Sequence, residues 1–227
     1  MTSVWTVSFR IFLTAPCPRA KNSAHEPDRR RLSSNYNRAV SDATLSSRKA
    51  ARKLVAQLQL AHAGELAAAY AYRGHWKSCS DPAEREQIRR IEEDEWHHRV
   101  LVRNLLTQLG ARPRVLREVR FFVIGRTLGL ACHALGWFIP MYAAGRLESH
   151  NVREYEDAAD CAVACGHPEM LDCLLTMAEV EWDHEKFFRE ALVDHPWLRF
   201  VRMWKAIPPR EAIRARFAGL MVTAADG

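Results

Sequence analysis

The chain has 227 residues, of which 48% are hydrophobic, with only ten Gly and ten Pro. This composition favours an α-helical protein with a substantial core. The net charge of +6 comes with no nucleic-acid-binding motif, so a nucleic-acid partner is not expected. The six cysteines form no C-x-x-C pair, which argues against a zinc knuckle or a rubredoxin-type site.

Residues 1–46 show no sustained apolar period and are rich in Ser, Arg, Asn and Pro. We interpret them as a disordered extension or a targeting segment. Residues 47–195 carry long helical patterns and are predicted to form one domain. Residues 196–227 form an aromatic and basic C-terminal tail.

Helical spacing of apolar residues predicts a first helix at about 46–77. Asp81 followed by Pro82 is a helix start signal, and Gly110 is a suitable end for the second helix.

A third helical region runs from about Val115 to Cys165, and Pro140 should kink or break it. His167 and Pro168 open a fourth helix that extends to about Val193.

Two segments are candidates for contact with a membrane. Residues 127–145 hold no charged residue except His133, a length that could just cross a bilayer. Because His133, Pro140 and several small residues weaken that interpretation, we expect a buried or membrane-dipping helix instead. In the tail, Trp197 to Trp204 alternates aromatic with cationic residues, which suits a membrane–water interface or a segment packed on the bundle.

Two E-x-x-H pairs lie in the second and fourth helices: Glu95 with His98, and Glu181 with His184. Residues three apart share a helix face, so each pair can reach one metal ion. Di-iron bundles combine two such pairs with one Glu from each of two further helices. Glu65 and Glu148 fill those positions.

The apolar rows of the helices predict that these side chains point inward. Glu95 and His98 continue the row of Ile91 and Val102, whereas Asp94 and His97 lie on a mostly polar row. Lone buried carboxylates would be costly, and a shared pair of metal ions removes that cost. Octahedral iron suits the mixed oxygen and nitrogen ligands better than tetrahedral zinc. A salt-bridged polar interior is the alternative.

The residues resemble the demethoxyubiquinone hydroxylase family over about 55–195. His62-Ala63-Gly64-Glu65 looks like the family's first-helix motif, and the order Glu, Glu-x-x-His, Glu, Glu-x-x-His matches its ligands. The spacing of Gly136, Glu148 and Tyr155 fits its third helix, although 137–147 departs from the usual small-residue stretch.

The resemblance implies a ferritin-like four-helix bundle with additional hydrophobic helical segments and extended termini. It implies two iron ions as cofactors, held by Glu65, Glu95, His98, Glu148, Glu181 and His184. The implied activity is a di-iron monooxygenase that uses O2 to hydroxylate a polyprenylated methoxy-benzoquinol in ubiquinone biosynthesis. Beside the ligands, His62, Tyr72 and Tyr155 could support the metal site or simply pack in the core.

A lipid quinol substrate implies a peripheral membrane protein, on the cytoplasmic side of a bacterial membrane or on the mitochondrial inner membrane. Other proteins of quinone biosynthesis are expected partners. Electrons must come from a partner or from the substrate, because no flavin or nicotinamide motif is present. The alternatives are a ferritin-like iron-oxidising or iron-binding protein, a di-iron oxidase of another lipid, and a non-catalytic scaffold.

Overall fold

A computed structural model describes residues 29–219, with side chains from residue 43 onward. The chain divides into two units, residues 1–40 and 41–227. The described part of the first unit is helical, and the buried core of the described residues lies in the second.

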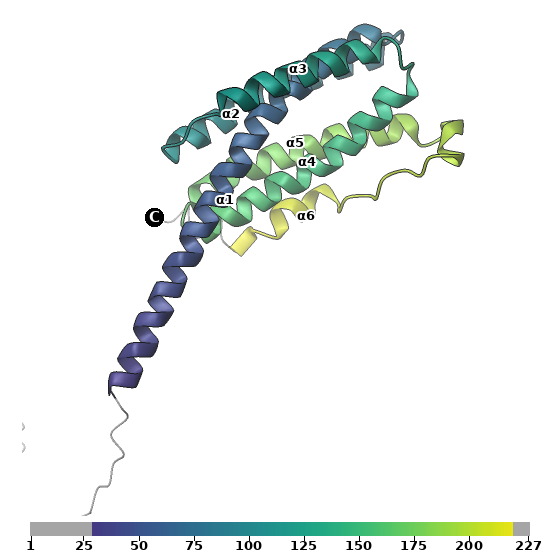
Figure 1. Ribbon diagram of the computed structural model, residues 1–227. Helices are drawn as coiled ribbons and strands as arrows, with labels where there is room; N and C mark the ends of the chain where they lie inside the picture. The colour runs from purple at the N-terminus through teal and green to yellow at the C-terminus, as the bar shows by residue number, and fades with distance from the viewer. Residues whose placement is uncertain (1–28, 220–227) are drawn as a thin grey trace, which may run out of the picture. The chain divides into compact units, whose positions relative to one another are not determined.

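The described residues form helices and no strand (Figure 1). In chain order the elements are α1 (Arg29–Ser78), α2 (Pro82–Gln108), α3 (Val115–Cys132), α4 (Phe138–Ala164), η1 (Pro168–Met170), α5 (Leu171–Leu192), η2 (Pro196–Arg199) and α6 (Arg210–Ala215). Helix α1 begins at Arg29, earlier than the apolar pattern predicts. Part of the expected N-terminal extension is therefore helical, and residues 1–28 lie outside the described residues.

Capping residues are found at both ends of α2, as the sequence predicts, and at the end of α4. Asp81 Oδ1 accepts hydrogen bonds from the backbone N–H groups of Ala83 and Glu84, both at 2.9 Å. Gly110 and Gly166 follow α2 and α4 with φ of 64° and 84°, a conformation that glycine adopts without steric cost.

The third helical region is interrupted, as predicted, but before Pro140. Helix α3 ends at Cys132 and α4 begins at Phe138, with Gly136 at φ 69° in the turn between them. Pro140 lies in the first turn of α4, where a missing backbone N–H is tolerated. Among the residues that the structure describes, no helix combines the length and hydropathy that a membrane span requires.

Four helices, α1, α2, α4 and α5, supply the core. Helices α4 and α5 run side by side (Figure 1). The largest fully buried side chains include Leu58, Ile91, Met141 and Phe188. The predicted inward rows are confirmed, since every residue named in them is buried or half-buried.

Helix α3 packs on α1 through glycines. Its buried residues are Gly125 and Gly129, and a Cβ atom at Gly125 would meet the backbone of Ala67. The backbones therefore touch, and the apolar side chains of α3 face outward. Val115 is 75% exposed and Leu116 is 87% exposed.

The chain after α5 is partly packed and partly exposed. Ile213 and Phe217 are buried in the core, whereas Trp197 is 50% exposed and Phe200 is 75% exposed. The expectation of a packed segment holds for 203–217, and segment 197–201 presents the exposed side chains of Trp197, Phe200 and Val201. The second unit is thus an all-α, ferritin-like bundle with an added hydrophobic helix.

Candidate metal centre

The six predicted ligands come together inside the bundle. Helix α1 contributes Glu65, α2 contributes Glu95 and His98, α4 contributes Glu148, and α5 contributes Glu181 and His184. Each of them is at most 4% exposed. The face assignments made from the apolar rows are therefore correct for all six side chains.

These side chains form two overlapping groups of potential metal ligands. The first is Glu65, Glu95, His98 and Glu181; the second is Glu95, Glu148, Glu181 and His184. Within each group, one ligand atom of every residue lies within 4.8 Å of the others. Because the two groups overlap at Glu95 and Glu181, the six residues could hold two neighbouring metal ions.

Several buried atoms of the cluster lack a hydrogen-bond partner. They are both carboxylate oxygens of Glu95, Oε2 of Glu181 and Nδ1 of His184. Buried polar atoms are normally paired, and an unpaired buried carboxylate is strongly unfavourable. Cations between the two groups would satisfy all four atoms, so the residues present fit a pair of metal ions.

The histidines are oriented by carboxylates. His98 Nδ1 lies 3.0 Å from Glu181 Oε1, and His184 Nδ1 lies 3.5 Å from Glu181 Oε2. The other ring nitrogen of His184, Nε2, lies 3.1 Å from Asp94 Oδ2. Such a contact fixes the ring and increases its basicity as a ligand.

Two tyrosines donate hydrogen bonds to the carboxylates at the two ends of the cluster. Tyr155 binds Glu65 Oε1, and Tyr72 binds Glu148 Oε1. Asn151 donates to the second oxygen of Glu148 at 2.9 Å. Both tyrosines therefore contact the predicted ligands directly, beyond their packing in the core.

His62 lies elsewhere. Its Nδ1 is 2.8 Å from Glu118 Oε1, and Arg99 pairs with the same carboxylate at 2.6 Å. Burial lowers the pKa of His62. The contacts of His62 thus connect α1 with α2 and α3, and none of them reaches a predicted ligand.

Protonation of the cluster follows from burial and charge. Burial raises the pKa of Glu65, Glu95 and Glu148. Burial acts in the same direction on Glu181, but the neighbouring imidazoles of His184 and His98 outweigh it and hold its pKa well below the ordinary value.

The pKa of His184 is raised to about 10, because the neighbouring carboxylates of Asp94 and Glu181 outweigh burial. Without metal, His184 would therefore carry a proton at neutral pH. Metal binding through its ring would displace this proton.

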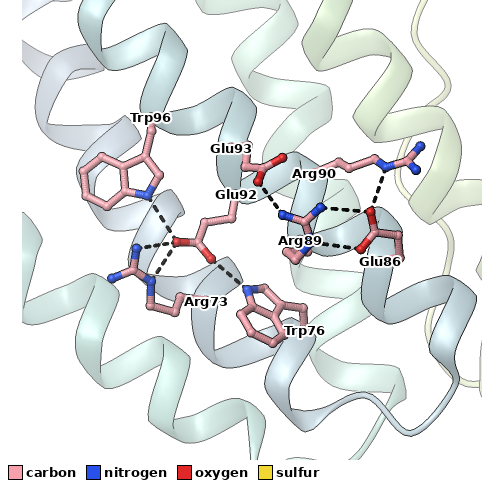
Figure 2. A network of polar contacts seen from close by, with 8 residues as sticks. All are labelled: Arg73, Trp76, Glu86, Arg89, Arg90, Glu92, Glu93 and Trp96. Carbon is pink, nitrogen blue, oxygen red and sulfur yellow. Dashed lines mark hydrogen bonds and ion pairs between the residues drawn. The ribbon is translucent and has the colours of Figure 1, made fainter.

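A second buried carboxylate system joins α1 to α2. Figure 2 shows Glu92 accepting from Arg73 Nε at 2.7 Å, Trp76 Nε1 at 2.7 Å and Trp96 Nε1 at 3.1 Å. Glu92 is 6% exposed. Because its oxygens are well supplied with donors, Glu92 is a structural carboxylate that holds the two helices together.

Sequence reasoning missed the roles of Asp94, Glu92 and Glu179. Asp94 lies on the polar row of α2 and is 49% exposed, yet it reaches a histidine of α5. Glu179 is buried beneath α6, where Arg214 Nε lies 3.0 Å from its Oε1. The partners of these carboxylates come from distant segments, so no local pattern could reveal them.

The fold and the cluster define a class: ferritin-like bundles in which carboxylates and histidines on four helices could hold metal ions. Within this class, the chain belongs to the family of ubiquinone biosynthesis protein COQ7, whose model matches residues 52–186. The matched range contains all six predicted ligands and assigns the chain to ubiquinone biosynthesis. No curated protein and no solved structure gave a significant match.

Proposed function

We propose that the protein is a di-iron monooxygenase that hydroxylates a polyprenylated methoxy-benzoquinol, demethoxyubiquinol, with O2. Glu65, Glu95, His98, Glu148, Glu181 and His184 would hold the two iron ions. The observation that carries the proposal is the cluster of four buried carboxylates and two imidazoles with unpartnered atoms at its centre. Iron held there would supply the activation of dioxygen for C–H hydroxylation.

An apolar pocket next to the cluster supports a lipid substrate. It has a volume of about 330 Å³ and lies among α1, α3 and α4. Glu65 and Tyr155 line it, together with apolar residues of α3 that include Phe121, Ile124 and Leu128. A quinol ring could therefore reach the ligand Glu65 while its isoprenoid chain contacts α3.

The protein's own side chains would orient the ring and hold protons. Tyr155 lines the pocket and hydrogen-bonds Glu65, so its hydroxyl would lie beside both a bound ring and the cluster. Burial raises the pKa of Tyr155 well above its ordinary value, which keeps the phenol protonated as a donor. The apolar walls exclude water from the reacting positions.

The exposed apolar surface supports peripheral docking on a membrane. It comprises the outward side chains of α3 and the exposed residues of segment 197–201. Phe138, the first residue of α4, contacts Trp197 with ring centroids 5.3 Å apart, so segment 197–201 lies beside the start of α4. Large exposed apolar patches mark membrane or protein interaction sites. We propose the cytoplasmic side of the cell membrane for a bacterial protein, and the mitochondrial inner membrane for a eukaryotic one.

The decisive experiment combines iron analysis with product analysis. The purified protein should contain about two irons per chain, and it should convert demethoxyubiquinol to the hydroxylated quinol in the presence of O2 and a reductant, as measured by mass spectrometry. Glu181→Ala removes a carboxylate shared by both ligand groups and should abolish iron binding and product formation.

The matched control is Glu190→Ala, which removes an exposed carboxylate of the same helix. This control should keep both properties. Iron binding with oxidation of free Fe(II) but no quinol product would instead identify an iron-oxidising protein.

A further inference from the structure

A basic groove lies between α4 and the chain that follows η2. Its volume is about 720 Å³. It is lined by four basic residues and two aromatic residues, Arg146, His150, Arg153, Lys205, Tyr142 and Trp204. None of the described residues that line it is acidic.

The wall of the groove is fixed by packing. Trp204 lies so close to Gly145 that a Cβ atom there would meet its ring, and Trp204 Nε1 donates to Glu185 at 2.6 Å. The hydroxyl of Tyr142 donates to the carbonyl oxygen of Arg202 at 2.7 Å. The segment around Trp204 is therefore held against α4 and α5, and the groove is a defined surface feature.

Two cations in the groove have no competing partner. Across the part of the chain that the structure describes, neither the Arg146 guanidinium nor the Lys205 ammonium forms a hydrogen bond or an ion pair. The nearby acids have other partners than these two cations: Glu154 pairs with His150 of the groove at 3.2 Å, and Glu185 pairs with Arg189. Guanidinium and ammonium groups in this state are good donors for a phosphate group.

The groove borders the apolar pocket. Leu147 and His150 line both, and Leu147 is 45% exposed on the ridge between them. A phosphate bound in the groove would therefore lie beside the mouth of the pocket. Tyr142 and Trp204 are of the residue types that favour the headgroup region of a bilayer.

We propose that this groove binds the phosphate of an anionic phospholipid headgroup. The bound headgroup would hold the mouth of the apolar pocket against the bilayer, where a lipid quinol enters. The inference rests on the proposed membrane docking. It adds a specific headgroup site to the exposed apolar surface of α3, and anionic leaflets attract basic residues of this kind.

Vesicle flotation tests the site. Full-length protein is floated with phosphatidylcholine vesicles and with vesicles that also contain phosphatidylglycerol. The variant R146Q/K205Q should lose about 30-fold in its partition coefficient on phosphatidylglycerol vesicles, and little on neutral ones. The control R48Q/K49Q removes the same two charges from exposed positions of α1 and should change partition by less than about threefold.

Three results would overturn the site: equal losses in the two double variants, an unchanged partition of R146Q/K205Q, or release of the protein from vesicles by inorganic phosphate. The last would identify a site for free phosphate. The single variant K205Q is measured as well, in case the double variant misfolds. It should give a smaller loss of the partition coefficient in the same direction.

Quinol hydroxylation in detergent is measured in parallel and should not change in R146Q/K205Q. Absence of hydroxylation in the unaltered protein would reject the proposed function, while flotation would still decide the headgroup site.

Discussion

Asp94 is a half-exposed residue that orients a histidine of the buried cluster. Its Oδ2 lies 3.1 Å from His184 Nε2, which leaves His184 Nδ1 directed toward Glu95 and Glu181. The contact determines which ring nitrogen faces the metal position. Carboxylates in this role typically contribute 10- to 100-fold to metal affinity.

We therefore expect Asp94→Asn to weaken iron binding by about 10- to 100-fold, measured by chelator competition. An amide oxygen accepts a weaker hydrogen bond from the ring N–H than a carboxylate oxygen does. Glu93→Gln changes the neighbouring exposed carboxylate, which is 62% exposed, and serves as the control. Equal iron affinity in the two variants would show that Asp94 does not orient His184.

His75 links the core to acid stability. It is 3% exposed and stacks near Tyr72 and Phe188, with ring centroids 6.3 and 6.1 Å away. Burial lowers its pKa to about 4. Between about pH 6.5 and pH 4, His75 is therefore protonated in the unfolded chain and neutral in the folded chain.

The stability that depends on neutral His75 is present above pH 6.5 and is lost as the pH falls toward 4. We expect His75→Phe to reduce the acid-side slope of the unfolding free energy by roughly 1 kcal/mol per pH unit in this window. Denaturant titrations at a series of pH values measure the slope. The exposed His97→Phe should leave it unchanged, and a wild-type slope in His75→Phe would contradict the assignment.

At the scale of elements, the contact between α1 and α3 depends on glycine. A Cβ atom at Gly74 would meet the backbone of Gly129, and one at Gly129 would meet the carbonyl oxygen of Tyr70. Backbone atoms cannot move aside as a flexible side chain can. A methyl group at these positions must therefore push the helices apart.

Gly125→Ala should destabilise the protein by about 1–3 kcal/mol, because its Cβ would meet the backbone of Ala67. Gly64→Ala, also within a helix, has no atom within 4 Å of its Cβ and should stabilise by up to about 1 kcal/mol. Chemical denaturation compares the two. Equal effects of the two substitutions would mean that α3 is not in backbone contact with α1.

At the scale of the whole molecule, segment 197–201 and α3 provide the apolar surface. Deleting residues 196–227 would test this surface poorly, because Ile213 and Phe217 are buried in the core. Point substitutions remove exposed side chains and leave the core intact.

Trp197→Ala with Phe200→Ala should lower partition onto neutral phosphatidylcholine vesicles at least tenfold, since two large aromatic side chains leave the bilayer. Lys186→Ala with Glu190→Ala, an exposed pair on α5, is the control. Unchanged flotation of the aromatic variant would remove segment 197–201 from the docking surface.

Much of this molecule is predictable from its sequence, for a physical reason. The six ligands continue apolar rows whose period is that of a helix, so the spacing alone marks Glu148 and Glu181 as inward-facing residues. The pattern does not reveal contacts between distant segments, such as Asp94 with His184. It also misplaces boundaries: the interruption predicted at Pro140 lies at 133–137, because proline is accepted in a first helical turn.

The apolar pocket is not symmetrical with respect to the two ligand groups. Glu65 lines it directly, whereas Glu148 is separated from it by Asn151, which lines the pocket and donates to Glu148. Two ions bound in the cluster would therefore be inequivalent, and a quinol analogue should perturb the Mössbauer signal of the Glu65-side iron more than that of the other. The chain would thus contain one metal position whose surroundings change when a ligand enters the pocket, and a second whose surroundings do not.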